Sequence, residues 1–342
     1  MHTPEHTTPK VLLVGGAGYI GGHTALALHD AGIPIAIFDN FSTSARDAWS
    51  MLSTSMPGVA LHEGDARDED AVHKALVGSG ATCVIHFAAL KSVPESVHKP
   101  LVYHKHNSEA LLSTLTAMER AGVRHVVFSS SAAVYGAAVP PIQENHALNP
   151  ANPYGGTKAW AERILSDLCG DGTGWNVTAL RYFNPVGADP AQRFGEWGRT
   201  AGNVAPLIAQ AALDGSPFSI TGADFNTPDG TGLRDYIHIA DLAEAHKAAV
   251  LRVVKGFEVL NVGRGAPTSV LELVKAFEQA AGRTIDVFYK PRRDGDVAAC
   301  WAAAEKAETV LGWKARHSLD DMARDTLRWM RVLARTQGTD TA

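Results

Sequence analysis

Cysteine is scarce in this chain, long apolar runs are missing, and no stretch is dominated by charge of one sign. The three cysteines, Cys83, Cys169 and Cys300, are scattered, so they predict neither a metal site nor a disulfide framework. The histidines, including His104 and His106, follow no metal-ligand pattern either. With 31 basic and 36 acidic side chains in mixed order, the charge suggests neither a nucleic-acid partner nor an anionic membrane. No apolar run reaches membrane-spanning length.

The composition is that of an ordinary globular protein. Of the 342 residues, 45% are hydrophobic and 20% are charged, and the length exceeds that of one simple domain. Residues 1–9 are polar and lack the apolar core of a signal peptide. Together with scattered cysteines, which are typical of a reducing compartment, this predicts a cytoplasmic protein.

A glycine-rich turn lies between an expected strand and an expected helix near the start of the chain. Residues 10–14 form a short apolar run, the glycine-rich segment 15–21 follows at once, and residues 23–31 have a helical pattern. This is the context that a dinucleotide-binding fingerprint requires. Gly15, Gly18 and Gly21 would make the turn tight, allow the backbone to approach a pyrophosphate, and let helix and strand pack closely, with the helix N-terminus facing the phosphates.

Asp39 is the candidate partner of the adenosine ribose. A second strand is expected at residues 33–38, and Asp39 ends it, 18 residues after Gly21. This is close to the spacing of roughly 20 residues at which an acidic residue binds the ribose hydroxyls. Because a carboxylate there repels a 2′-phosphate, NAD is expected in preference to NADP.

Strands and helices keep alternating after this unit, which predicts an α/β fold with a doubly wound parallel sheet. Further strands are expected at residues 59–62, 82–87 and 123–128, and further helices at residues 68–77 and 103–121. The segment 82–87 is an almost continuous apolar run, as in parallel strands that are buried on both faces. Polar side chains at the carboxyl ends of such strands are where ligands bind.

Tyr154 and Lys158 are the candidate catalytic pair. They stand four residues apart at the start of a helical stretch, so their side chains share one face of a helix. A phenol with its ordinary pKa of about 10 is a poor base at neutral pH. An ammonium beside it favours the phenolate, and a bound cationic cofactor ring would favour it further. Ser131, where the 123–128 strand opens into a serine cluster, is placed to hydrogen-bond the hydroxyl that Tyr154 would deprotonate.

After Gly187 the alternation breaks, which indicates a smaller α/β substrate domain interleaved with the first. We expect a loop at residues 188–200, helices at 203–213, 270–281 and 319–333, and a helix at 241–253 and a strand at 258–262 that return to the sheet. The predicted NAD-binding domain comprises residues 10–187 with 239–265, and the predicted substrate domain comprises residues 188–238 and 266–335. Arginines in a turn at residues 229–234 and at residues 292 and 293 suit a diphosphate.

These motifs resemble those of a known family. The chain resembles the extended short-chain dehydrogenase/reductases, and among them it is very similar to the UDP-glucose 4-epimerases, from about Lys10 to Arg331. The resemblance rests on the glycine turn and the Tyr-Lys segment and on Phe-Asp-Asn (38–40), His-Phe-Ala-Ala-Leu-Lys (86–91), Ser-Ser-Ser-Ala-Ala-Val-Tyr-Gly (129–136), Arg-Tyr-Phe-Asn-Pro-Val-Gly (181–187), Asp-Gly-Thr-Gly-Leu-Arg-Asp-Tyr-Ile-His (229–238) and Pro-Arg-Arg-Asp-Gly-Asp (291–296).

The resemblance implies an NAD-dependent interconversion of UDP-glucose and UDP-galactose. Tyr154 would take the proton of the sugar 4-hydroxyl while hydride leaves carbon 4 for the cofactor, and the 4-keto sugar would turn about its diphosphate before the hydride returns. Ser131 would share the hydrogen bond, and Lys158 would hold the nicotinamide ribose and lower the pKa of Tyr154. A homodimer through the helices that contain Tyr103 and Tyr154 is implied as well.

The resemblance also assigns binding residues. The implied cofactor contacts are Gly15, Gly18, Tyr19, Ile20, Gly21, Asp39, Asn40, Asp65, Ala66, Phe87, Ala88, Ala89, Lys91, Asn107, Ser129, Tyr154, Lys158, Tyr182 and Phe183. The implied contacts to the UDP-hexose are Lys91, Ser131, Tyr154, Asn184, Asn203, Val204, Arg234, Arg293, Asp296 and Cys300.

The chain departs from the family pattern at several positions. Ala133 replaces a threonine, Ala89 replaces a glycine, and Thr221 stands where an aromatic residue is common near the uridine. Cys300 occupies a position at the hexose pocket that is a bulky tyrosine in some members. The smaller side chain leaves room beside carbon 2 of the sugar, which predicts that N-acetylated UDP-hexoses are substrates too. The alternative is that Cys300 is a buried small hydrophobe without a part in selectivity.

Two further alternatives stay open. A 4,6-dehydratase or a UDP-glucuronate epimerase would share the fold and the Tyr-Lys pair, but a dehydratase normally carries Asp-Glu where this chain has Ala132-Ala133. A non-catalytic NAD sensor is the alternative from another class. Such proteins typically lose the tyrosine or the lysine, and both are present here.

Overall fold

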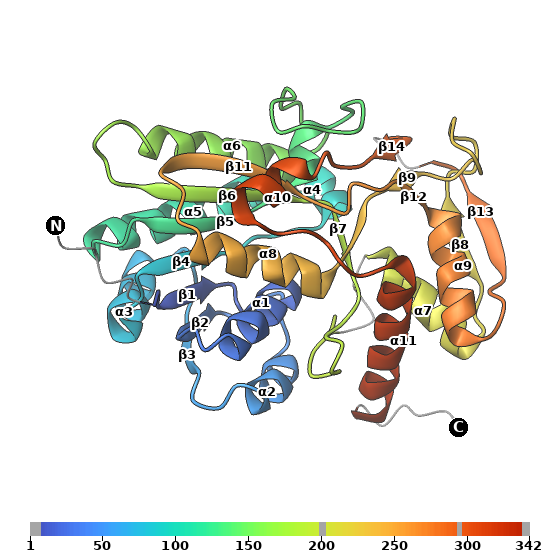
Figure 1. Ribbon diagram of the computed structural model, residues 1–342, viewed down its shortest axis with the longest axis horizontal. Coiled ribbons are helices and arrows are strands. Elements are labelled where there is room, and N and C mark those ends of the chain that lie inside the picture. Colours follow the sequence, from blue (N-terminus) through green and yellow to red (C-terminus); the bar gives the residue numbers. More distant parts are fainter. Residues whose placement is uncertain (1–7, 198–202, 293–295, 337–342) are drawn as a thin grey trace.

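The fold is organised around one seven-stranded parallel sheet. The computed structural model describes residues 8–197, 203–292 and 296–336. The order of strands across the sheet is β11-β6-β5-β4-β1-β2-β3, which is a doubly wound arrangement and confirms the predicted fold class (Figure 1). The strands are β1 (Val11–Val14), β2 (Ile35–Asp39), β3 (Ala60–Glu63), β4 (Cys83–His86), β5 (His125–Ser131), β6 (Asn176–Tyr182) and β11 (Gly256–Val262).

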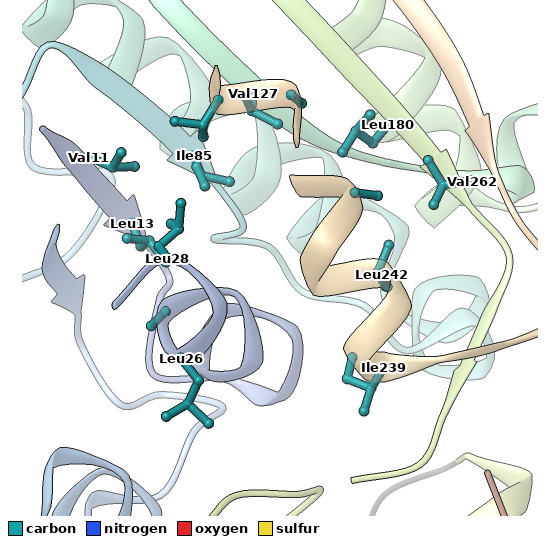
Figure 2. Packing of buried hydrophobic residues seen from close by; sticks show 14 of the residues in the cluster. Val11, Leu13, Leu26, Leu28, Ile85, Val127, Leu180, Ile239, Leu242 and Val262 are labelled. Carbon is teal, nitrogen blue, oxygen red and sulfur yellow. The ribbon is translucent and has the colours of Figure 1, made fainter. Parts of the chain in front are cut away.

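Helices cover both faces of this sheet, and the apolar side chains of the strands alternate between the two faces. Val11 and Leu13 of β1 pack with α1 (Tyr19–Asp30), α2 (Arg46–Thr54), α8 (Ile239–Leu251) and α10 (Glu305–Leu311), and Figure 2 shows this cluster between α1, α8 and the strands. Leu12 and Val14 pack on the opposite face with α3 (Glu69–Ser79), α5 (Pro100–Arg120) and α6 (Pro153–Leu168). All four side chains are fully buried, as expected for a parallel strand covered on both faces.

A second layer of structure gathers around α7, α9 and α11, at the right of Figure 1. Its apolar core joins α7 (Val204–Asp214), α9 (Val270–Ala281) and α11 (Leu319–Thr336) to β8 (Phe218–Thr221), which pairs in parallel with β13 (Val287–Lys290). Short strands complete it, namely β7 (Asn184–Val186) with β10 (Tyr236–His238), and β9 (Leu233–Arg234) between β12 (Thr268–Ser269) and β14 (Ala299–Cys300). Two short helical segments remain, α4 (Val93–His98) and the 3₁₀ helix η1 (Ala132–Tyr135).

The second layer is interrupted in the sequence, because α8 and β11 return to the large sheet. β11 pairs along its whole length with β6, and α8 packs against α1. We therefore keep the division into residues 10–187 with 239–265, and residues 188–238 with 266–335, as our proposal for the two domains.

Three details differ from the sequence-based expectation. Helix α1 begins at Tyr19, so Gly21 lies inside the helix and not before it. Ser129 to Ser131 belong to strand β5 and not to a loop, because they pair with residues 180–182 of β6. Leu233 and Arg234 form strand β9 and are not part of a turn, because these two residues pair with β12 on one side and with β14 on the other.

Two carboxylates, the buried Asp235 and the exposed Asp229, hold the 229–238 segment in its conformation. Asp235 is fully buried, and its carboxylate accepts hydrogen bonds from the backbone N–H groups of Arg264 (2.8 Å), Gly265 (3.0 Å) and Ala302 (3.2 Å). Asp229 accepts hydrogen bonds from Thr231 and from Ser269 Oγ, the residue that caps α9. Because buried N–H groups must find acceptors, much of this motif serves the fold.

Of the helices in the described residues, none is long and apolar enough to cross a membrane.

Candidate active site

A cavity of about 310 Å³ lies along the carboxyl ends of the central strands. It is lined by residues that follow β1, β2, β3 and β4, by the ends of β5 and β6, and by the first turn of α6. Its lining contains the predicted cofactor contacts Gly15, Gly18, Tyr19, Ile20, Gly21, Asp39, Asn40, Asp65, Ala66, Phe87, Ala88, Ala89, Lys91, Ser129, Tyr154, Lys158, Tyr182 and Phe183. The position agrees with the rule that open parallel sheets bind ligands at this edge.

The glycine turn is built so that the backbone can approach a ligand. Gly15 has a φ of +78°, and a Cβ there would lie 2.6 Å from the backbone nitrogen of Ala88. A Cβ at Gly21 would lie 2.8 Å from the carbonyl oxygen of Gly15, so no side chain fits at either position. Gly18 caps α1 without a side chain, which leaves the first N–H groups of the helix open toward the cavity. This cradle fits the pyrophosphate of a dinucleotide.

Asp39 lies at the other end of the cradle and is almost buried. Its carboxylate accepts hydrogen bonds from the N–H of Ala17 at 2.9 Å, from the N–H of Phe41 at 2.8 Å and from Ser44 Oγ at 2.9 Å. The side chain thereby joins the glycine turn to the loop after β2. It also places a negative charge in the cavity wall, where a 2′-phosphate would meet it.

Tyr154, Lys158 and Ser131 meet at the other side of the cavity. Asn152 caps α6 by accepting a hydrogen bond from the N–H of Gly155, so Tyr154 and Lys158 stand on the first turns of the helix. The Lys158 ammonium donates a hydrogen bond to the carbonyl oxygen of Ser129 at 2.7 Å, and it lies 6.0 Å from the centre of the Tyr154 ring. Ser131 hydrogen-bonds the Tyr154 phenol. The predicted convergence of these three side chains is therefore present.

Burial sets the acid–base properties of the pair in the protein alone. It raises the pKa of Tyr154 above its ordinary value, although the hydrogen bond with Ser131 opposes this. Burial also lowers the pKa of Lys158 to about 8, although the carboxylate of Glu162 opposes this. The tyrosine is therefore not activated by the lysine alone, and the expected lowering of its pKa requires a further positive charge in the cavity.

Asn107 differs from the other predicted cofactor contacts, and its contact with the cofactor stays a prediction. Within the described residues, it is the one predicted cofactor contact that does not line the cavity. Its side-chain oxygen accepts a hydrogen bond from the N–H of Leu90 at 2.8 Å, and its amide nitrogen donates to the oxygen of Leu90 and to Thr157 Oγ1, both at 3.1 Å. The amide is occupied by these bonds. Asn107 thus positions the loop that carries Ala88, Ala89 and Lys91, and it ties that loop to α6.

The substrate side of the cavity contains Lys91, Asn184 and Asn203 in addition to the catalytic residues. Asn203 precedes α7, and its amide nitrogen donates a hydrogen bond of 2.6 Å to Glu196. Burial raises the pKa of Glu196, whereas Lys91 and Asn203 act in the opposite direction. Glu196 was not found from the sequence, because the polar segment around it has no periodic pattern.

Four predicted substrate contacts are not part of this wall, and a fifth cannot be placed. In the part of the chain that the structure describes, Val204, Arg234, Asp296 and Cys300 lie outside the cavity lining, and Arg293 lies outside the described residues. Arg234 and Cys300 are paired across strands β9 and β14, and Asp296 is exposed. Their contacts with a substrate stay predictions.

The cavity wall also contains residues that the sequence analysis missed, namely Phe38, Ser42, Thr43, Gly64, His106 and Pro185. Ser42 and Thr43 follow the end of β2, so the rule that placed Asp39 could have found them. Gly64 precedes Asp65, and a Cβ on it would lie 2.8 Å from the Phe38 ring. Nothing in the sequence marks His106.

Comparison with known proteins places the chain in a family. Residues 11–263 match the NAD dependent epimerase/dehydratase family. The chain belongs to this family. A curated relative, the UDP-glucose 4-epimerase of Bacillus subtilis (strain 168), is 42% identical over 325 residues, which cover 93% of this chain and 96% of the relative.

Two solved structures are similar to this chain over nearly its whole length. The UDP-glucose 4-epimerase from Bifidobacterium longum in complex with NAD⁺ and UDP has a TM-score of 0.90 and 40% identity, and the match covers 96% of this chain and 99% of that chain. The UDP-Glc/GlcNAc 4-epimerase from Campylobacter jejuni has a TM-score of 0.81 and 31% identity, with 95% and 99% covered.

Among residues 8–197, 203–292 and 296–336, no group of three or more His, Cys, Asp or Glu side chains could hold a metal ion.

The cradle generates a prediction about cofactor choice. We expect the purified protein to carry NAD and to prefer it to NADP, and we expect Asp39→Ala to weaken this preference, because the charge that repels a 2′-phosphate is lost. Binding of both dinucleotides to stripped protein would be measured by calorimetry.

Ser44→Ala is the matched control, since it removes one hydrogen bond of Asp39 and keeps the charge. Equal affinity of the unmutated protein for NAD and NADP would refute the role given to Asp39.

Proposed function

We propose that this protein is an NAD-dependent UDP-glucose 4-epimerase, which interconverts UDP-glucose and UDP-galactose. The observation that carries the proposal is the meeting of Tyr154, Lys158 and Ser131 in the wall of the same cavity as the glycine turn. The identity of about two fifths to epimerases over nearly the whole chain supports the choice of reaction.

The residues present fit NAD. The glycine turn with the N-terminus of α1 would hold the pyrophosphate, Asp39 would hold the adenosine ribose, and Lys158 would hold the nicotinamide ribose. Bound NAD would supply a hydride acceptor for carbon 4 of the hexose, and it would give the same hydride back.

The protein's own side chains manage the proton. Tyr154 takes the proton of the 4-hydroxyl as carbon 4 is oxidised, and it returns the proton when the opposite face of the sugar is reduced. Ser131 hydrogen-bonds the same hydroxyl and the phenol, so it keeps the two oxygens in line. Lys158 supplies a positive charge close to the phenol, and its bond to Ser129 holds that charge in place.

Burial makes this arrangement sensitive to charge. The pKa of the Tyr154 phenol is raised in the protein alone, so the phenolate forms only when positive charge stands near it. The Lys158 ammonium and a cationic ring in the cavity supply such charge together. Proton abstraction is thereby linked to the presence of the oxidised cofactor.

The substrate is held at its nucleotide end in this proposal. Asn184 and Asn203 line the cavity, and Arg234, Arg293 and Asp296 are proposed to anchor the UDP group together with Val204. A sugar that rotates between the two hydride transfers needs a fixed diphosphate, and the sugar itself can make only few contacts with the protein. Lys91 lies on the same side of the cavity and offers a cation to the diphosphate.

The alternatives are less well supported by the same site. A 4,6-dehydratase needs an acid–base pair after the serine, and this chain has Ala132 and Ala133 there, at the start of the 3₁₀ helix η1. A UDP-glucuronate epimerase would use the same catalytic residues on a carboxylated sugar. A non-catalytic sensor would not need the buried Tyr154–Lys158 pair. A cytoplasmic location stays a prediction from the sequence.

We propose in addition that the protein is a homodimer through α5 and α6. These two helices pack against each other, with α4 beside them. Several apolar side chains on them are exposed, namely Val93, Val97, Leu101, Val102, Leu112 and Trp160. Leu101 is 82% exposed, which is costly for a side chain of its size unless a partner covers it.

The first prediction from this function concerns Tyr154. Tyr154→Phe should lower turnover of UDP-galactose by roughly 100- to 10,000-fold, because it removes the acid–base hydroxyl, while fold and NAD content stay as in the unmutated protein. Turnover would be followed by separation of the two UDP-hexoses without added cofactor. Near-normal turnover in this variant would exclude Tyr154 as the acid–base residue.

The second concerns substrate range. Cys300 packs against the apolar cluster that contains Phe183, a residue of the cavity wall, so a larger side chain at position 300 would press toward the hexose. We expect the unmutated enzyme to epimerise UDP-N-acetylgalactosamine, and Cys300→Tyr to abolish that activity and spare UDP-galactose, because packed sites do not yield to a clash. Cys300→Ser is the control of similar size. No turnover of the N-acetylated sugar by the unmutated enzyme would contradict the hypothesis.

The third concerns assembly. We expect a dimer in solution by light scattering, and a monomer for the double variant Leu101→Asp and Trp160→Asp, because buried charges at an interface are costly. Val77→Asp on α3 is the control, since Val77 is an exposed apolar residue on another helix. A monomeric unmutated protein, or a dimer that survives the double substitution, would refute this interface.

A further inference from the structure

The three serines at the end of β5 have three different partners. The carbonyl of Ser129 accepts the Lys158 bond, and Ser131 hydrogen-bonds Tyr154. Ser130 faces away from the cavity, and its hydroxyl donates a 2.5 Å hydrogen bond to Glu162, one helical turn beyond Lys158.

Glu162 is part of a buried ion pair behind the catalytic residues. Its carboxylate accepts hydrogen bonds from Arg181 Nε at 2.8 Å and from Arg181 Nη2 at 2.5 Å, and both side chains are at most 5% exposed. Arg181 also donates a 2.7 Å bond to the Tyr135 hydroxyl, which in turn donates to Asn261 of β11. Neither member of the ion pair lines the cavity. Such buried pairs are weak evidence of a contribution to stability, because desolvation offsets their attraction.

The position of Glu162 on α6 indicates a function for the ion pair other than stability. Tyr154, Lys158 and Glu162 follow one another at intervals of four residues, so they lie along one face of the helix. Glu162 therefore flanks the ammonium of Lys158 on one side, and the phenol of Tyr154 flanks it on the other.

The charges around Lys158 come from three elements. The neighbouring groups on α6 itself are Glu162 and Tyr154. Strand β6 contributes Tyr182, a phenol whose pKa is raised by burial, and Arg181, which is paired with Glu162. Strand β4 contributes His86, whose pKa is lowered to about 3 by burial and by Lys158 itself, so the imidazole is neutral. Among these described groups, Glu162 is the one anion.

We propose that Glu162 is a positioning residue for catalysis, whose buried carboxylate keeps the Lys158 ammonium charged, with Arg181 holding that carboxylate in place. The proposal rests on the proposed epimerase function. It assigns a role in the reaction to a residue that contacts neither cofactor nor substrate.

The physical reason lies in the burial of Lys158. Its ammonium has a neutral carbonyl as acceptor and lies over the Phe128 ring at 4.9 Å, and burial opposes its charge. A negative charge one turn away opposes that effect. Without it, the lysine would lose its proton at lower pH, and the phenolate would then lose the positive charge beside it. The pH range in which both are in the active form would narrow at its upper end.

The experiment measures the pH profile of kcat/KM for UDP-galactose in the NAD-bound enzyme. Glu162→Gln alone leaves Arg181 unpaired and is expected to fold poorly, so the double variant Glu162→Gln with Arg181→Met is used as well. The double variant removes a cation together with the anion, but of the two charges the Glu162 carboxylate is the one that shifts the pKa of Lys158. We therefore expect its upper pH limit to fall by up to about one pH unit, with the lower limit unchanged. Glu162→Asp, which keeps the charge, should keep the width of the profile.

Ser130→Ala is the matched control, because it removes a hydrogen bond of Glu162 and leaves the charge. We expect its limits to be unchanged. The proposal would be overturned if kcat/KM of the double variant fell by the same factor at every pH. It would also be overturned if the Ser130→Ala profile narrowed as much as that of the double variant.

A second readout separates this inference from the proposed function. The Lys158 amine is titrated by nuclear magnetic resonance of ¹³C-labelled lysine side chains in the NAD-bound protein, with Lys158→Met as the reference that assigns the signal. A lower Lys158 pKa in the double variant supports the inference even if the enzyme acts on another sugar nucleotide, and an unchanged pKa overturns it. Absence of UDP-galactose turnover in the unmutated protein would refute the proposed function alone.

Discussion

The hydrogen bond from Lys158 to the carbonyl of Ser129 is the contact on which the proposed site depends. It joins helix α6 to the end of strand β5. Tyr154 comes four residues before the lysine and Ser131 two residues after the carbonyl, so this bond ties together the two elements that carry the proposed catalytic hydroxyls. A buried ammonium with a neutral acceptor is unfavourable by itself. The surrounding ring of Phe128 and the carboxylate of Glu162 compensate for this.

Local signals made the cofactor side of the site predictable. The glycine turn requires close approach of two backbone segments, and Gly15 and Gly21 are placed where a Cβ would collide. Asp39 follows a buried strand, and the Tyr154–Lys158 spacing needs nothing beyond the helical repeat. These features depend on residues close in sequence, so the pattern alone indicated the α/β fold, the glycine turn, Asp39 and the Tyr154–Lys158 pair, whereas the family resemblance supplied the other predicted residues of the cavity wall.

Long-range contacts were not predictable in the same way. The hydrogen bonds of the Asn107 amide to Leu90 and Thr157 were not predicted, because they depend on how α5 meets α6. Arg234 was expected in a turn, but it lies in a strand because β9 pairs with two segments that come later in the chain. Glu196 was missed altogether, since its role comes from the packing of an irregular segment. A residue's neighbours across the chain decide each of these cases.

The irregular segment that contains Phe194 and Glu196 explains how the two sides of the site keep their relative position. On the cofactor side, His23 Nε2 of α1 lies 3.2 Å from the carbonyl oxygen of Phe194. On the substrate side, Trp329 of α11 donates a 2.9 Å hydrogen bond to the carbonyl of Glu196, whose carboxylate holds Asn203 at the start of α7. A hexose that must rotate about its diphosphate during the reaction cannot be held by many contacts of its own. The positions of the reacting groups then depend on the surrounding protein structure. This segment joins helix α1 on the cofactor side to helices α7 and α11 on the substrate side.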